Sequence, residues 1–385
     1  MPGATIDHMI SVTILITAML IAMVTFNNMF ASAVAYERNR QVTMKAVDLI
    51  DTACLSPGNP ANWSQTNSAI IGFGLQDPES SGYSLSTYSP MRLRTSQDSQ
   101  LVQYGTTFYN NISFGYGGYL LVPVGDCVNY TRTAELLGVN GTYGFGINIA
   151  PTLSVSISEV SLNPLEFKVE TRGPGLPLTN ASLNYYLFHL DPEGGEFPSI
   201  ITHSGIIQNG SSSIKFSLDA SDDAYSLLVY VHLSGLNGVG YYSRDVTSSS
   251  DALILPFVQD FENGKVIIAN NSPADSVYYN ATFFILNQGF QLQQVQIENS
   301  TDNLEYGTYN TTKVPASETG ILLISYKQGA SIGSVVMPWG IGTLGVTAVF
   351  GGDSTGYSFV ATELRQVRIN EVSYLVKLSA WRLRG

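Results

Sequence analysis

The chain has 385 residues, of which 12% are charged, and its formal net charge is −12 at pH 7. This length allows about two or three domains, each able to bury a hydrophobic core. The acidic balance excludes nucleic acid as a partner, because no basic patch could neutralise phosphates.

The first predicted element is a helix long enough to span a membrane. Residues 9–36 carry no formal charge, and residues 9–26 read MISVTILITAMLIAMVTF. This run exceeds the ~20 residues that an α-helix needs to cross a bilayer. It is also too long for a cleaved secretory signal and lacks a basic start. We therefore expect a membrane-embedded helix rather than a buried helix of a soluble core, with the lipid bilayer as its partner.

The helical pattern continues into an amphipathic second part. Residues 36–54, YERNRQVTMKAVDLIDTAC, contain no Gly or Pro, and Val42, Ala46, Leu49 and Ala53 recur at helical spacing. This face needs a surface to pack on, either the downstream domain or a neighbouring copy. The sequence PGNP at residues 57–60 then ends the helix. About 48 residues at ~1.5 Å each predict a rod ~70 Å long.

The N-terminal residues place a carboxylate at the edge of the apolar run. The chain begins MPGATIDH, and an acidic side chain near hydrocarbon is costly unless it is paired, so Asp7 is a candidate functional residue. Together with the long helix and the β-rich remainder, this start resembles the type IV pilin family, including its archaeal and pseudopilin branches. The leader is shorter than usual, and the family normally has Glu as the fifth mature residue. An ordinary signal anchor with an interfacial Asp is the alternative.

The resemblance implies processing and assembly at the N-terminus. Cleavage would follow Gly3, and Ala4 would become the first residue of the mature chain. Asp7 would then meet the new amino group of a neighbouring subunit. The partners would be other pilin-like subunits, or copies of this chain, that associate through the helix.

Glycosylation motifs favour an extracellular location for the rest of the chain. Ten Asn-x-Ser/Thr sequons follow the helix, about twice the number expected by chance, and their chemistry requires exposed, secreted backbone. A Ser/Thr/Asn-rich β protein that accumulates sequons by composition is the alternative. The sequon at Asn270 is weakened by Pro273, which follows it. The other candidates begin at Asn62, Asn111, Asn129, Asn140, Asn180, Asn209, Asn280, Asn299 and Asn310.

The charges beside the helix favour the opposite orientation. Arg38, Arg40 and Lys45 lie on its C-terminal side, and no Lys or Arg precedes it. The positive-inside rule would therefore place the C-terminal side in the cytoplasm, although the rule is weakest for large downstream domains. Because that region carries the sequons, we expect a single-pass protein of the cell membrane with its globular region extracellular.

The two cysteines, Cys54 and Cys127, suit an oxidising exterior. A disulfide between them would join the end of the helix to the first globular region. It would close a loop of ~70 residues, worth roughly 4 kcal/mol in the chain-entropy description. Two unrelated buried thiols are the alternative. Two Cys and four scattered His do not supply a zinc site, and we expect no cofactor.

The remainder predicts a series of β regions. Residues 57–150 form a β-rich first region, with strands at 114–124 and 143–149 and a short helix or strand at 92–102. The glycine pairs in this region lack the Lys-Ser/Thr and helix start of a phosphate loop, so they indicate turns. Residues 151–254 predict an immunoglobulin-like β-sandwich, because six candidate strands recur at roughly ten-residue spacing. They are 153–160, 165–171, 181–190, 213–218, 225–233 and 239–243. The segment FKVETRGPGLPLTNASLNYYLF in this region resembles surface immunoglobulin-like repeats.

Residues 255–385 predict a C-terminal β domain. Its candidate strands are 265–269, 277–286, 290–297, 320–326, 333–337, 345–350, 357–361 and 372–380. The segment from Asn280, NATFFIL, echoes the segment from Asn180, NASLNYYL, which hints at repeated sandwich units. The expected fold is therefore a long N-terminal transmembrane helix, residues 1–56, followed by mainly-β domains.

Catalysis finds little support in the sequence. His189 and Asp191 could form a ligand pair, but a strand end before a turn is the favoured interpretation. Two short acidic segments, at 222–223 and 353, lack the spacing of an EF-hand. No G-x-S-x-G or Cys–His arrangement is present. We therefore expect that the protein is not an enzyme.

These observations predict an extracellular, membrane-anchored structural subunit, a pilin-like component of a surface filament or secretion apparatus. The alternative is a monomeric cell-surface adhesion or binding glycoprotein that uses the helix only as an anchor. A carbohydrate-active surface enzyme is a third, weaker interpretation, because three Trp and no convincing carboxylate pair offer it little support.

Overall fold

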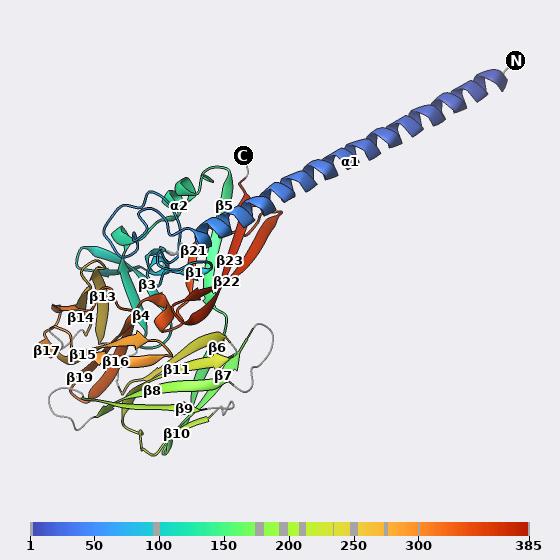
Figure 1. The fold of residues 1–385 in the computed structure, drawn as a ribbon. Coiled ribbons are helices and arrows are strands. Elements are labelled where there is room, and N and C mark those ends of the chain that lie inside the picture. Colours follow the sequence, from blue (N-terminus) through green and yellow to red (C-terminus); the bar gives the residue numbers. More distant parts are fainter. Residues whose placement is uncertain are drawn as a thin grey trace.

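A computed structural model describes residues 3–94, 101–173, 181–191, 199–207, 213–233, 235–246, 253–272, 276–298 and 301–383. One long helix, α1 (Gly3–Leu55), projects from a head built of β-sheets (Figure 1). The expected fold class, a long apolar N-terminal helix followed by a mainly-β region, is confirmed.

Helix α1 has two parts with different surroundings. Every described side chain from Asp7 to Ala33 is exposed, and the helix is long and apolar enough to cross a membrane. From Val42 onward one stripe is buried, with Val42, Ala46 and Leu49 only 0–3% exposed. These residues lie three or four positions apart, so a single face of the helix is covered. The predicted change from an apolar to an amphipathic helix is therefore observed.

The surface that covers this stripe is a five-stranded sheet, here called the basal sheet. Its order is β1-β22-β23-β5-β21, and it is antiparallel except where β1 pairs with β22. Helix α1 packs on β22, β23 and β1, and β22 and β23 run beside its lower part in Figure 1. The strands are β1 (Ser84–Leu85), β5 (Tyr143–Pro151), β21 (Ala348–Gly351), β22 (Val360–Ile369) and β23 (Val372–Arg382).

The first sandwich is formed by a three-stranded and a four-stranded sheet. Its sheets are β10-β7-β6 and β12-β11-β8-β9, and Phe167, Leu187 and Val229 belong to the core they enclose. Strands 1, 2 and 5 thus face strands 3, 4, 6 and 7, which is an immunoglobulin-like arrangement. The strands are β6 (Ser154–Leu162), β7 (Leu165–Arg172), β8 (Ser182–Asp191), β9 (Ser199–Ile207), β10 (Ser213–Phe216), β11 (Ala224–Leu233) and β12 (Leu236–Arg244).

The second sandwich repeats this arrangement. Its sheets are β13-β14-β18 and β16-β15-β19-β20, with the short β17 also paired to β15. Residues 182–187 and 280–286 of the echoing segments lie in β8 and β15, the third strands of the two sandwiches, which is what a repeated unit predicts. The strands are β13 (Ile254–Asp260), β14 (Lys265–Asn270), β15 (Val277–Asn287), β16 (Gln291–Val295), β17 (Thr301–Leu304), β18 (Tyr309–Lys313), β19 (Gly320–Gln328) and β20 (Ser331–Trp339).

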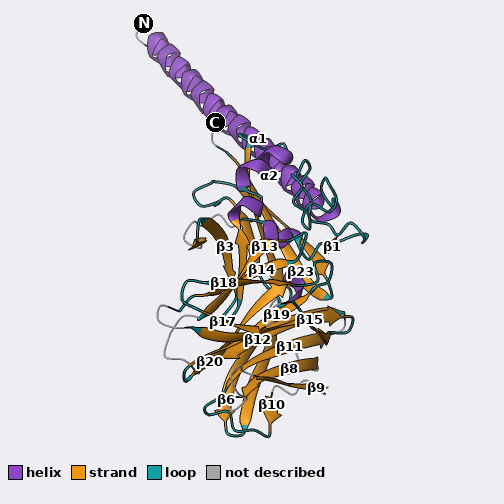
Figure 2. Cartoon of the chain, turned by 90° about the vertical axis from the view of Figure 1, so that its left-hand side faces the viewer, coloured by secondary structure: helices purple, strands orange, loops and turns teal. Residues whose placement is uncertain are grey.

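A small sheet from the first globular region, β2-β3-β4, covers the outer face of the second sandwich. Both faces of β13 and β14 are therefore buried: Val258 and Val266 point to the main core, Phe257 and Ile267 to the small one. The first sandwich lies at the end of the head away from the tip of α1 (Figures 1 and 2). The remaining elements are η1 (Ser89–Arg92), β2 (Leu101–Tyr104), β3 (Thr107–Ser113), β4 (Tyr119–Pro123), η3 (Val124–Asp126), α2 (Tyr130–Leu136) and η4 (Ile341–Thr343).

Two sequence-based assignments need correction. Regions 57–150 and 255–385 are not separate units, because β5 of the first pairs with β21 and β23 of the second. The strand expected at 357–361 is instead β22 (Val360–Ile369), whose alternate side chains include exposed polar groups that weakened its apolar pattern. The segment expected at 92–102 contains the end of η1 and the start of β2, while residues 95–100 lie outside the described chain.

Candidate functional site

The predicted processing and assembly residues lie at the free tip of α1. Gly3, Ala4 and Asp7 all belong to its first turns, and the Asp7 side chain is exposed. At ~1.5 Å per residue, Asp7 lies roughly 50 Å along the helix from Val42, where burial begins. Between them, residues 9–33 form an apolar, exposed surface, with Met9 71% and Phe26 73% exposed, and polar residues follow at 37–41. This tip and its exposed surface form the candidate assembly site.

A polar contact fixes the other end of α1 to the basal sheet. The Nε of Arg365 on β22 donates to Oδ1 of Asp51 at 2.9 Å, and the Tyr83 hydroxyl donates to the same oxygen at 3.3 Å. Hydrogen bonding to Asp51 raises the pKa of the Arg365 guanidinium. The contact lies beside the buried stripe, so it sets the rotation of the helix about its axis as well as its position.

The two cysteines are free thiols in the structure. Cys54 is buried on α1, and Cys127 is partly buried just after η3. Of the two alternatives that the sequence left open, the structure contains separate thiols and not the disulfide. Burial raises the pKa of Cys127 to about 12, so this thiol stays protonated at neutral pH and is a poor nucleophile.

The sequons differ in how accessible they are. Asn270 is only 3% exposed, and its Nδ2 donates to the Leu304 carbonyl at 3.0 Å, so a glycan there would need local rearrangement. The side chain of Asn310 is also engaged, because its Nδ2 donates to the Tyr279 hydroxyl at 2.9 Å. Asn180, Asn209 and Asn299 lie outside the described residues. Exposed candidates are Asn62, Asn129 and Asn140, and partly buried ones are Asn111, Asn280 and Asn310.

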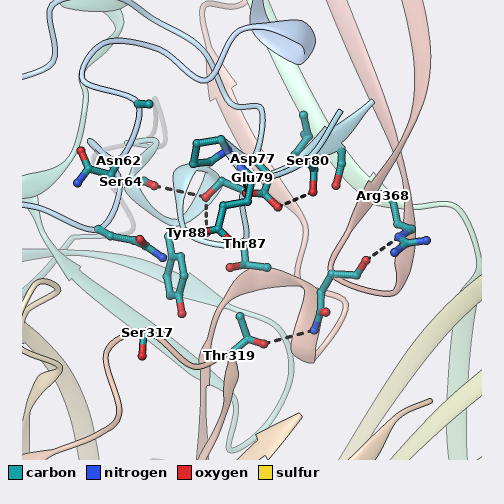
Figure 3. Close-up of a pocket in the computed structure, with 17 residues that line it drawn as sticks. Asn62, Ser64, Asp77, Glu79, Ser80, Thr87, Tyr88, Ser317, Thr319 and Arg368 are labelled. Atoms are coloured by element: carbon teal, nitrogen blue, oxygen red, sulfur yellow. Dashed lines mark hydrogen bonds between the residues drawn. The ribbon is translucent and has the colours of Figure 1, made fainter. Parts of the chain in front are cut away.

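A polar pocket of about 410 Å³ lies between the N-terminal part of the head and the edge of the basal sheet (Figure 3). It is lined by residues from four segments: 61–65, 77–88, 317–319 and 368–370. The hydroxyls of Ser64 and Ser86 meet at 3.3 Å in one wall. On another wall Asp77 accepts from the Ser80 hydroxyl at 2.8 Å and from the Glu79 backbone N–H at 3.1 Å.

Sequence reasoning missed this polar pocket, because its lining residues are separated by more than two hundred positions in places and together form no binding motif. Only Asn62, as a sequon, had been singled out. The signal that could have identified it is the density of Ser and Thr around the Asp77-x-Glu79 turn. That composition is also typical of ordinary loops.

The sequence offered His189 and Asp191 as a possible ligand pair, but the side chain of Asp191 lies outside the described part of the structure. His189 Nε2 lies 2.6 Å from Oδ2 of Asp223, and both of these side chains are 14% exposed. Among the described residues, no three His, Cys, Asp or Glu side chains come together in a metal-binding arrangement.

Comparison with known proteins does not assign the chain to a family. No family model matches the chain, and no curated protein matches it. Among solved structures, the chain is similar at 9% identity to the calcium-bound pair of C2 domains of Extended-Synaptotagmin 2, over 62% of this chain and 96% of that one. The TM-score of 0.12 is too low to support an argument about fold or function.

Proposed function

We propose that this protein is a membrane-anchored structural subunit with an extracellular head, a type IV pilin-like component of a surface filament or secretion apparatus. Its exposed apolar helix would pack against the helices of neighbouring subunits, and its head would be displayed outside. The proposal assigns no catalytic role to the head.

The observation that carries the proposal is the continuity of α1. An anchor needs only ~20 apolar residues and tolerates a flexible connection to its domain. Here one 53-residue helix passes from a fully exposed apolar part directly into the core of the head. The packed stripe and the Asp51–Arg365 contact fix the head relative to the helix axis. Such rigid coupling is useful where helices pack together and thereby position their heads.

A second candidate is a monomeric adhesion or binding glycoprotein. It is supported by the two immunoglobulin-like sandwiches, an architecture common to many cell-surface domains. In that case the helix would lie in the bilayer alone, and Asp7 would be solvated by water or headgroups.

Self-association through the helix tip separates the two candidates. An unpaired carboxylate becomes costly when packed helices exclude water, and the amino group of Ala4 on an adjacent processed chain is the cation that would meet Asp7. We expect intact-mass measurement of membrane-isolated protein to show a chain that begins at Ala4. We also expect in-membrane crosslinking to give multimers that Asp7→Asn reduces severalfold without loss of insertion.

Asp48→Asn is the matched control, because Asp48 is an exposed carboxylate on the same helix, outside the apolar part. It should crosslink like the wild type. An uncleaved N-terminus together with an entirely monomeric wild type would reject the pilin-like proposal and favour the anchor.

A further inference from the structure

We propose that the polar pocket is a carbohydrate-binding site that holds a small, neutral saccharide. The inference rests on the geometry and charge of the pocket. It does not depend on the pilin-like function, because a subunit or a monomeric surface protein could equally carry such a site.

The pocket has the size and the hydrogen-bonding groups that a saccharide needs. Its volume of about 410 Å³ lies within the ~300–1,000 Å³ range of small-molecule sites. Hydroxyl side chains, including Thr87, Ser317 and Thr319, line it from several sides (Figure 3). Each hydroxyl can donate and accept, so it can match a sugar hydroxyl in either role.

Two charged side chains bring unused hydrogen-bonding capacity to the pocket. The Arg368 Nε donates to the Asn370 carbonyl at 2.9 Å, and no other described residue accepts from this guanidinium. The Glu79 side chain is exposed, and its carboxylate accepts no hydrogen bond from the described part of the chain, while the Glu79 backbone N–H donates to Asp77. A guanidinium and a carboxylate in one pocket can bind vicinal hydroxyls through charge-assisted hydrogen bonds.

The balance of charge decides the class of ligand. Asp77 and Glu79 together carry more negative charge than Arg368 offsets, so a phosphate or another anion would be repelled. Two carboxylates without further acidic or His ligands do not form a metal site among the described residues. An apolar ligand would leave the polar groups of the lining without hydrogen-bond partners. A neutral molecule with many hydroxyls satisfies all three conditions.

The saccharide has two possible sources. Asn62, an exposed sequon residue, itself lines the pocket, so a glycan on its Nδ2 would begin beside the pocket. A free saccharide or the glycan of another molecule presents the same hydroxyls. Glycopeptide mass spectrometry of the full-length protein, purified from membranes in detergent, identifies whether Asn62 carries a glycan.

If Asn62 carries a glycan, its removal should loosen the opposite wall of the pocket. Hydrogen–deuterium exchange in segments 317–319 and 368–370 should then rise in Asn62→Gln. The matched control is Asn140→Gln, an exposed sequon residue that does not line the pocket, and it should leave exchange there unchanged.

Free saccharides test the same pocket when Asn62 is bare or replaced by Gln. Isothermal titration with glucose, mannose, galactose, N-acetylglucosamine and their disaccharides should give saturable binding by at least one of them. Arg368→Gln and Glu79→Gln should each weaken that binding about 10-fold or more, because each removes a charge-assisted hydrogen bond.

Arg382→Gln is the control for the titration. Arg382 lies on β23, nine residues beyond Ser373, the residue that pairs with Arg368 on β22. This places it roughly 30 Å along the strand from Arg368, so its substitution should not change saccharide binding. Thermal melts establish that each variant is folded. Two negative results together overturn the proposal. The first is that no saccharide binds to protein in which Asn62 carries no glycan or is replaced by Gln. The second is that Asn62→Gln leaves hydrogen–deuterium exchange in segments 317–319 and 368–370 unchanged. Equal weakening by Arg382→Gln and Arg368→Gln also overturns it.

Discussion

Asp245 is a largely buried carboxyl group at the joint between the two sandwiches. It follows β12 of the first sandwich, accepts from the Tyr326 hydroxyl at 2.6 Å, and accepts from the Ser334 backbone N–H at 3.0 Å. Burial raises its pKa from 3.8 to about 6, although both hydrogen bonds favour the charged form. The hydroxyl of Ser226 lies 2.7 Å from that of Ser334, so polar groups of both sandwiches meet in the part of the joint that contains Asp245. Its stability should therefore depend on pH.

The direction of this pH dependence follows from proton linkage. The folded protein binds the Asp245 proton more tightly than the unfolded chain does, so the folded state gains stability in acid and loses it as pH rises through about 6. Relative to Asp245→Asn, the free energy of unfolding of the wild type should fall by about 2 kcal/mol between pH 4 and pH 7. Urea unfolding of the detergent-solubilised chain at several pH values measures this difference.

Tyr326→Phe extends the test of Asp245. It removes a hydrogen bond that stabilises the carboxylate, so the transition should move to higher pH. A difference between wild type and Asp245→Asn that stays constant from pH 4 to pH 7 would show that this carboxyl does not set the stability of the joint.

At the scale of an element, α1 is held by its buried stripe more than by charge. Leu49 and Ala46 are 1% and 0% exposed against the basal sheet, whereas the Asp51–Arg365 pair is partly solvated. Partly exposed ion pairs contribute little to stability, typically about 1 kcal/mol or less. Burial of apolar side chains therefore supplies most of the attachment.

Truncation of a residue in the stripe should weaken the attachment of the helix to the head. Leu49→Ala should lower the free energy of unfolding by about 2–4 kcal/mol, because it leaves a cavity under the helix. Met44→Ala is the control, since Met44 is 61% exposed on the same helix and its truncation should change stability by less than about 0.5 kcal/mol. If Leu49→Ala and Met44→Ala lowered stability equally in thermal or urea unfolding, the stripe would not be what attaches the helix to the head.

Local sequence pattern was sufficient for some elements and not for others. Helix α1, β8 and β23 have strong periodicity and were predicted close to their observed positions. Strand β11 reads as a continuous apolar run because both of its faces are buried: Val229 faces the core of the first sandwich, and Tyr230 faces the second. Strands β1, β3, β9, β13, β17 and β18 were not predicted. The polar pocket was also missed, since only the fold brings Glu79 and Arg368, which are far apart in sequence, to the lining of one pocket.

At the scale of the whole molecule, long-range pairing determines the architecture. Ile147 of β5 pairs with Leu378 of β23, so strands from both ends of the globular region build the basal sheet on which α1 lies. No local pattern contains that pairing, which is why residues 57–150 and 255–385 were expected to be separate regions. The two sandwiches, by contrast, are each continuous in sequence, and the first was predicted from the spacing of its strands.

The orientation of the head across the membrane is a prediction at this scale. The sequons favour an extracellular head, whereas Arg38, Arg40 and Lys45 favour a cytoplasmic one. We expect external protease on intact cells to degrade the region after residue 56 and to release fragments that carry glycans. A cytoplasmic protein should remain intact in the same sample as the control for cell integrity. Full protection of an unglycosylated head would place it inside the cell.

The side-by-side contact between α1 and the strands β22 and β23 has a mechanical consequence. Under the proposed function, a force that pulls on the far sandwich reaches the membrane-spanning part of α1 through this contact, which runs along the helix axis. Contacts spread along that axis, from Val42 to Ala53, share such a shear load and must give way together. A flexible tether would instead leave the head free to swing under the same pull. The head of this protein should therefore resist tension without turning relative to its anchor.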